Sequence, residues 1–335
     1  MAGSVTMTMV ARAAGVSVST VSHVVNGTRP VAPATRQIVL DAMDRLDFTH
    51  RPVARSLAAG STTTIGLAIS SLSTTYWPEL VAGFQEEARR WNLQLLVAAT
   101  AEDNIHEERA VANLLAHHIA GLVITPAPNW QDTTLRLLRE HPIPFVIVDR
   151  IQDVKADQVG VENETSSAAI VDHLIQRGHT RIAMITGLEG LTTTEERRAG
   201  YLRAFRHRGV EVDPTLLVPG GSTESGGRRA MVELLARSDP PTAVFSASDS
   251  MTVGALRALR EANLTVPDDM AMVAFDEFPW GDAFEPRLTT VAQPCFAIGA
   301  RAIQMLRRRL EDPSLPPQTL RLSPEIVHRS SCGCR

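Results

Sequence analysis

Residues 6–27 read TMTMVARAAGVSVSTVSHVVNG, and this stretch decides the fold of the N-terminal part of the chain. In each half, apolar residues recur at the spacing of one buried helix face. These residues are Met7, Val10, Ala11 and Ala14, followed by Val21, Val24 and Val25. Gly15 interrupts the pattern, and the hydroxyl of Ser17 can cap a second helix. A helix, a tight glycine turn and a second helix form the helix-turn-helix plan.

A third helix is expected to complete this small domain, because Pro33 suits a first helical turn and an apolar stripe follows it. A plain three-helix bundle would show the same pattern. Its solvated faces, however, usually carry Glu and Lys. The outer faces of the second helix instead carry short side chains and no acid, namely Ser17, Val18, Ser19, Thr20, Ser22, His23 and Asn26. Such side chains let a helix approach phosphates and base edges in a DNA groove.

Charge is distributed unevenly along the chain. The formal net charge is −4 at pH 7, yet residues 1–60 hold six arginines, three aspartates and no lysine or glutamate. A basic head on an acidic body is expected when only the head meets phosphate groups.

The pattern changes after residue 49. Residues 50–62 predict a linker with one or two helical turns, too short to be stable alone in water. From Thr64 onward, short apolar runs alternate with amphipathic stretches, which is typical of parallel sheets with helices on both faces. The seven runs that predict strands are 65–70, 95–99, 121–124, 145–149, 182–185, 243–246 and 270–275.

This organisation predicts three parts. Residues 1–49 would form an all-α helix-turn-helix DNA-binding head, and residues 50–62 a hinge. Residues 63–335 would form an α/β core, and seven strands spread over this length fit two doubly wound lobes better than one.

Motifs of catalysis and cofactor binding are absent from the sequence. It has no glycine-rich phosphate loop, no nucleophile elbow and no HExxH pair. His117 and His118 are adjacent, so their side chains face apart and suit a helix end at the surface. We therefore expect no enzyme activity and no cofactor.

The three cysteines predict neither a disulfide framework nor a metal site. Cys295 is isolated, while Cys332 and Cys334 form a C-x-C pair near the C-terminus. A structural zinc site would need two further ligands, so we expect a reduced, frayed tail. No signal peptide or membrane-length apolar run is visible, so a cytoplasmic location without membrane contact is expected.

The stretch 6–27 resembles the signature of the lactose/galactose repressor (LacI/GalR) family. The likeness continues, in family order, through TRQIVLDAMDRLDF (35–48), VARSLAAG (53–60), IGLAIS (65–70), DHLIQRGHTRIAMITG (172–187), RRAGY (197–201), PTAVFSASD (241–249), PRLTTVAQP (286–294) and SCGC (331–334). The resemblance implies a dimeric transcriptional repressor that binds a palindromic DNA operator and responds to a small molecule. It also implies a core like that of periplasmic sugar-binding proteins, with a ligand cleft between two lobes.

The resemblance, with the chemistry of the second helix, predicts the DNA-binding residues. Val18, Ser19 and His23 are expected to touch bases, although the family usually has Arg at the position of His23. Phosphate contacts are expected from Ser17, Thr20, Asn26 and Thr35, with Thr6 and Ser22 also at the interface. For Thr20 and Ser22, simple filling of the helix surface is the alternative. In the hinge, Ala54 and Leu57 would meet the minor groove, where Leu57 would wedge open a base step.

The effector is expected to be a sugar or a sugar derivative. Carboxylates accept hydrogen bonds from hydroxyls, Arg donates in a fixed fork, and aromatic rings stack on a sugar's apolar face. The predicted contacts are Asp149, Arg197, Ser248, Asp249, Asp276 and Gln293, with Tyr76 and Trp77 as stacking rings and Trp280 as a further ring. Asp149 and Asp276 could instead cap helices or pair with arginines. Leu191 and Gly221 stand where some relatives have ligand contacts, which leaves the identity of the effector open. A purine or nucleoside is the alternative effector, although Gly221 removes a stacking surface that a base would use. Because Ser248 stands where Asn is frequent and the aromatic contact is missing at Gly221, a ligand-insensitive core is the other alternative.

Overall fold

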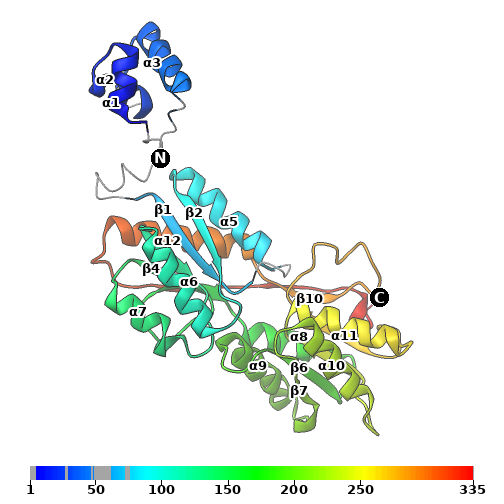
Figure 1. The fold of residues 1–335 in the computed structure, drawn as a ribbon. Helices are drawn as coiled ribbons and strands as arrows, with labels where there is room; N and C mark the ends of the chain where they lie inside the picture. The colour runs from blue at the N-terminus through cyan, green and yellow to red at the C-terminus, as the bar shows by residue number, and fades with distance from the viewer. Residues whose placement is uncertain (1–4, 27–28, 47, 49–61, 72–75, 335) are drawn as a thin grey trace. The chain divides into compact units, whose positions relative to one another are not determined.

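The computed structural model describes residues 5–26, 29–46, 48, 62–71 and 76–334 of the chain. The chain divides into two compact units, residues 1–62 and 63–335, which are drawn in Figure 1. The predicted hinge contacts Ala54 and Leu57 lie outside the described residues.

The N-terminal unit contains the three expected helices, α1 (Met7–Ala14), α2 (Val18–Asn26) and α3 (Pro33–Arg45). Gly15 ends α1 in the left-handed conformation, with φ at 65°, which a residue without Cβ adopts at no steric cost. The helices bury a small common core of Val10, Ala11, Val21, Val24, Val39 and Ala42. The sequence pattern thus gave the correct helices, and burial of their apolar faces holds them together.

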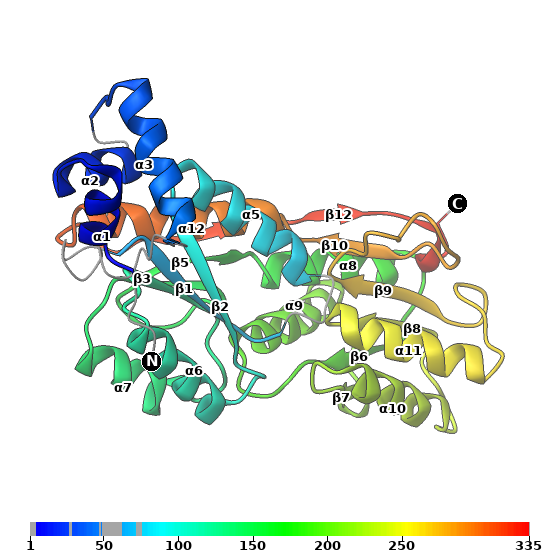
Figure 2. The ribbon, with the colours of Figure 1, turned by 45° about the horizontal axis from the view of Figure 1, so that its top comes forward.

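Residues 63–335 form two lobes, each built on a six-stranded sheet (Figures 1 and 2). The first sheet has the order β11-β5-β4-β3-β1-β2, and the second has the order β12-β10-β9-β8-β6-β7. The strands of the first lobe are β1 (Thr64–Ile69), β2 (Gln94–Ala99), β3 (Gly121–Ile124), β4 (Phe145–Asp149), β5 (Asp157–Val161) and β11 (Thr319–Leu322). Those of the second are β6 (Ile182–Thr186), β7 (Leu217–Pro219), β8 (Ala243–Ser246), β9 (Ala271–Phe275), β10 (Thr289–Ala292) and β12 (Glu325–Val327).

Helices cover both sheets. The first lobe has α5 (Tyr76–Arg90), α6 (Asn104–Ala116), α7 (Thr134–Glu140) and α12 (Cys295–Glu311); the second has α8 (Glu164–Gln176), α9 (Thr192–Arg208), α10 (Glu224–Leu235) and α11 (Asp249–Glu261). Short 3-10 turns occupy Trp130–Asp132, Pro214–Leu216 and Ser330–Cys332. In the first lobe α5 packs against α12, and in the second the pairs are α8 with α9 and α10 with α11. No helix of the described residues is long and apolar enough to cross a bilayer.

The chain passes between the lobes three times, between β5 and α8, between β10 and α12, and between β11 and β12. Each sheet is parallel except where β12 pairs antiparallel with β10. Because parallel strands end at one edge of a sheet, the carboxyl ends of both sheets can border one crevice, where doubly wound folds bind ligands.

Five of the twelve strands described were not expected from the sequence: β5, β7, β10, β11 and β12. Most are three or four residues long or polar, so they lack the apolar run that predicts a strand. Helix α12 crosses α5 closely enough that a Cβ on Gly83 would collide with the backbone oxygen of Phe296.

The expectation of a frayed C-terminal tail is wrong. Cys332 is fully buried, and Cys334 is partly buried. Ser331 fastens this segment to the second sheet, because its hydroxyl donates to the carbonyl of Met272 at 2.7 Å and accepts from the amide of Thr289 at 2.8 Å.

Candidate functional site

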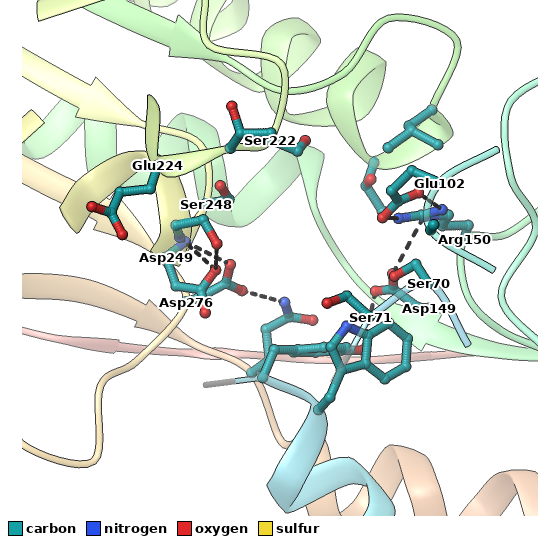
Figure 3. Close-up of a pocket in the computed structure, with 18 of the residues that line it drawn as sticks. Ser70, Ser71, Glu102, Asp149, Arg150, Ser222, Glu224, Ser248, Asp249 and Asp276 are labelled. Atoms are coloured by element: carbon teal, nitrogen blue, oxygen red, sulfur yellow. Dashed lines mark hydrogen bonds and ion pairs between the residues drawn. The ribbon is translucent and has the colours of Figure 1, made fainter. Parts of the chain in front are cut away.

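A cavity of about 910 Å³ opens where the carboxyl ends of both sheets meet, with lining residues from both lobes (Figure 3). This volume is in the range of small-molecule binding sites. Eight of the nine predicted effector contacts lie along it: Tyr76, Trp77, Asp149, Arg197, Ser248, Asp249, Asp276 and Gln293. Trp280 is not among the lining residues and packs on Phe278 instead, with ring centroids 4.6 Å apart.

The first-lobe side of the cavity is built on Asp149, the last residue of β4. The hydroxyl of Tyr76 donates to Oδ1 of Asp149 at 3.1 Å, and Nε of Arg150 lies 3.6 Å from Oδ2. Burial raises the pKa of Asp149, which the charges of Arg150 and Arg197 oppose. Burial, assisted by Asp149, also raises the pKa of Tyr76 well above 10, so its hydroxyl keeps the proton that it donates.

The second-lobe side is organised around Arg197 of α9. Its Nε donates to Oδ1 of Asn163 at 2.9 Å, and its Nη1 donates to the carbonyl oxygen of Ala247 at 2.7 Å. The guanidinium also stacks on Phe275, with Cζ 3.6 Å from the ring centroid. These contacts hold the fork rigidly, with Nη1 4.0 Å from Oδ2 of Asp276.

Asp276 follows β9 and is almost fully buried. It accepts from Nε2 of Gln293 at 2.6 Å and from the backbone N–H of Asp249 at 3.2 Å. Burial raises the pKa of Asp276 to about 6, Arg197 lowers it, and the carboxylate of Asp249 raises it. The alternative roles considered for Asp276, capping a helix and pairing with an arginine, are therefore both present in part, through the N–H of Asp249 and the guanidinium of Arg197. Asp276 nevertheless lines the cavity.

Asp149 and Asp276 both have a strained backbone conformation. Asp149 has a φ of 72° and Asp276 a φ of 78°, and each stands directly at the end of a central strand. A non-glycine residue in the left-handed region costs about 1–3 kcal/mol and concentrates at functional sites. The fold thus turns a carboxylate toward the cavity from each lobe in the same way.

In the N-terminal unit, the predicted DNA contacts lie on α2 and around it. Ser17 caps α2, because its Oγ accepts from the amide of Thr20 at 3.1 Å, and it lies 2.7 Å from Oγ of Ser19. Val18 is 44% exposed, so its side chain is accessible to a partner. The other predicted contacts stand at the surface or partly buried: Ser19 exposed, and Thr20, Ser22, His23 and Thr35 partly buried.

Thr6 has a structural role that competes with DNA contact, because its Oγ1 accepts from the amide of Met9 at 3.4 Å and caps α1. Asn26 is the last residue of α2, and its side chain lies outside the described part of the structure. Among the described residues of this unit, Arg12, Arg29, Arg36 and Arg45 are exposed and add positive charge to its surface.

Two family models match parts of the chain. Residues 6–50 match the model of bacterial regulatory proteins of the lacI family, and residues 171–332 match a periplasmic binding protein-like domain. The ribose operon repressor of Escherichia coli (strain K12) is 34% identical over 327 residues, which cover 97% of this chain and 99% of that protein. The chain belongs to the lacI family of bacterial regulatory proteins.

Solved structures extend the similarity of this lacI-family protein to its whole length. A Lac repressor dimer bound to operator and the anti-inducer ONPF superposes with a TM-score of 0.85 at 26% identity, covering 98% of this chain and 99% of that one. A complex of the transcriptional regulator CelR with cellobiose has a TM-score of 0.75 at 31% identity, with the same coverage.

The cavity of this lacI-family protein has polar residues that the sequence analysis missed. Arg150 forms a two-pronged pair with Glu102, with both N–O distances at 2.6 Å, and Figure 3 shows it across the pocket from Asp249 and Asp276. Both residues follow strand ends, β4 and β2, and this position was the signal that could have found them. Leu191 also lines the cavity, while Gly221 does not.

Proposed function

We propose that this protein is a ligand-responsive transcriptional repressor that binds a palindromic DNA operator as a dimer. The head supplies the operator contacts through α2, and the cavity between the lobes binds the effector. A dimer follows from the two half-sites of a palindrome, each of which needs one head.

On the DNA side, α2 would lie in the major groove. Val18, Ser19 and His23 would contact base edges, while Ser17, Thr20 and Thr35 would hold phosphates. Support comes from the exposed Val18, which can meet a thymine methyl group, and from the absence of acidic residues on α2.

The effector would be a sugar or a sugar derivative. The observation that carries this proposal is the pair of strained carboxylates, Asp149 and Asp276, which line one cavity from opposite lobes. Carboxylates accept from sugar hydroxyls, Arg197 can donate to a ring substituent, and Tyr76 and Trp77 offer apolar faces. The CelR–cellobiose complex gives independent support from a relative of similar fold.

Regulation would follow from the position of the cavity. A ligand that forms hydrogen bonds to Asp149 of the first lobe and Asp276 of the second binds best when the lobes are closed around it. Such a ligand therefore shifts the population toward the closed state. The three crossings between the lobes allow such a movement, because only short connections join the lobes.

A thermal-shift screen tests the effector assignment. We expect a member of a panel of sugars, sugar phosphates, purines and nucleosides to raise the melting temperature of the full-length protein by mass action. The Arg197→Ala variant should lose this shift and still bind operator DNA. Arg203→Ala is the matched control, since this arginine of the same helix pairs with Glu164 at the surface.

Three other outcomes would each correct one part of the proposal: the class of effector, the response to a ligand, or the position of the site. A shift from purines or nucleosides alone would replace the sugar by the alternative effector class. If no panel member shifts the melting temperature, the core is ligand-insensitive. An Arg197→Ala variant that still responds to the wild-type ligand at the same concentration would place the effector site elsewhere.

A further inference from the structure

A cluster of metal-binding side chains lies in the second lobe, away from the cavity. His173, in the last turn of α8, points its Nε2 at the sulfurs of both Cys332 and Cys334, at 3.3 Å and 3.2 Å. The three ligand atoms all lie within 4.8 Å of one another. Residues about 160 positions apart in the chain are thus brought to one point by the fold.

The cluster is held by contacts that do not involve its own ligand atoms. Nη2 of Arg177 donates to the carbonyl oxygen of Gly333 at 2.6 Å, which fixes the backbone between the two cysteines to α8. The ring of His328 packs on that of His173, with centroids 4.5 Å apart, and limits its rotation. The C-terminal segment lies beside the second sheet at the end of that lobe (Figure 2).

The thiol of Cys332 can donate to the carbonyl oxygen of Arg329, 3.3 Å away, so hydrogen bonding leaves Nε2 of His173 to the thiol of Cys334. A neutral imidazole nitrogen that accepts has a single lone pair, so Nε2 of His173 can accept from only one of the two thiols. A metal ion among the three atoms would use all of them. In a tetrahedral zinc site, bonds of about 2.3 Å to sulfur and 2.0–2.1 Å to nitrogen separate the ligand atoms by about 3.6 Å. The two nitrogen–sulfur distances, 3.3 Å and 3.2 Å, need only a few tenths of an ångström of expansion to reach this value.

We propose that His173, Cys332 and Cys334 form a zinc-binding site that fastens the C-terminal segment to α8. Two thiolates and an imidazole suit Zn²⁺ better than Mg²⁺ or Ca²⁺, which prefer oxygen ligands. A water molecule would complete the tetrahedron. Oγ1 of Thr289 lies 3.2 Å from the sulfur of Cys332 and supports its thiolate as a hydrogen-bond donor.

The site is independent of the effector proposal. None of the three ligands lines the interlobe cavity, and none belongs to the DNA-binding head. Zinc would act here on the stability of the second lobe, because binding to the folded chain alone raises the free energy of unfolding.

Zinc titration of the full-length protein tests the proposal. The protein is stripped with a chelator, kept reduced, and titrated with Zn²⁺ in competition with a chromophoric indicator. We expect one Zn²⁺ per chain and a higher melting temperature on binding. Co²⁺ in place of Zn²⁺ should give a thiolate charge-transfer band in the near ultraviolet.

Three variants decide whether the named ligands bind the ion. Cys334→Ser removes a ligand at the partly exposed end of the chain and should weaken zinc binding by more than about 100-fold, since even supporting residues of metal sites contribute 10–100-fold. His173→Gln is the second test if Cys334→Ser folds poorly by circular dichroism. Cys295→Ser is the control, because it removes the remaining thiol, which lies at the start of α12, and should keep one Zn²⁺ per chain.

Two results would overturn the proposal. One is a reduced wild-type protein that binds no Zn²⁺ against the indicator. The other is a folded Cys334→Ser or His173→Gln variant that binds Zn²⁺ as tightly as the wild type.

Discussion

At the scale of single residues, Asp276 carries the sharpest electrostatic conflict of the cavity. Its carboxyl is buried beside the carboxylate of Asp249, and the stacked guanidinium of Arg197 stabilises its charge only in part. The result is a pKa of about 6, so this carboxyl gains or loses its proton at a pH slightly below neutral. The ionisation of such a carboxyl therefore depends on the pH and on the ligand bound beside it.

We therefore expect effector binding to depend on the ionisation of Asp276. A sugar hydroxyl donates to the ionised carboxylate, so affinity should fall as the pH decreases through about 6. Dissociation constants measured at pH 5, 6, 7 and 8 check this. Asp276→Asn should bind more weakly at pH 7 and lose the pH dependence that arises at this residue. A wild-type affinity that is constant over this range would contradict the assignment.

The same pKa has an opposite consequence for the ligand-free protein. Between about pH 4 and pH 6 the folded chain binds a proton at Asp276 that the unfolded chain has released. Stability from this group is thus highest below pH 4 and falls as the pH rises through 6. The change amounts to at most about 3 kcal/mol for a shift of about two pKa units.

At the scale of elements, α2 carries the specificity of the proposed operator contact. We expect His23→Ala to relax base preference at one position of each half-site, at a cost of about 1–3 kcal/mol for the preferred base. Thr20→Ala serves as the comparison, because loss of a phosphate contact weakens binding evenly across sequences. An operator library selected with each variant measures both effects. Even weakening by His23→Ala would remove this residue from the list of base contacts.

Elements with strong local patterns were predictable from the sequence. Helices α1 to α3 and the seven apolar strands bury apolar residues at a regular spacing, so their period is visible in the chain. Strand β5 was missed because it begins with Asp157 and Gln158. Nε of Arg309, far along the chain, lies 2.9 Å from Asp157 and satisfies its charge, and Gln158 bonds to the backbone of residue 152. A sequence pattern does not show such distant partners.

The carboxylates of the cavity were predictable from the sequence, whereas the ligands of the proposed zinc site were not. Asp149 and Asp276 stand at strand ends, where the topology of parallel sheets collects side chains. The zinc ligands were missed because their spacing is long: His173 lies in a helix that packs beside the last strand of the chain. Only the fold brings this helix to the C-x-C pair.

At the scale of the whole molecule, we expect a dimer as the stable form. Sedimentation equilibrium at micromolar concentration should give twice the 36.4 kDa mass of the chain. A stable monomer, or a tetramer that the C-terminal segment holds together, would contradict this expectation.

The three crossings between the lobes also govern the order in which a newly made chain can fold. The first sheet receives β11, and α12 covers its face, only after the whole of the second lobe from α8 to β10 has been synthesised. Until then, β5 is an open edge strand and the apolar face under α12 is bare, which are the features that invite aggregation. Residues 295–327 are therefore the segment that completes both lobes, and a chain truncated before α12 should leave two incomplete sheets rather than one finished lobe.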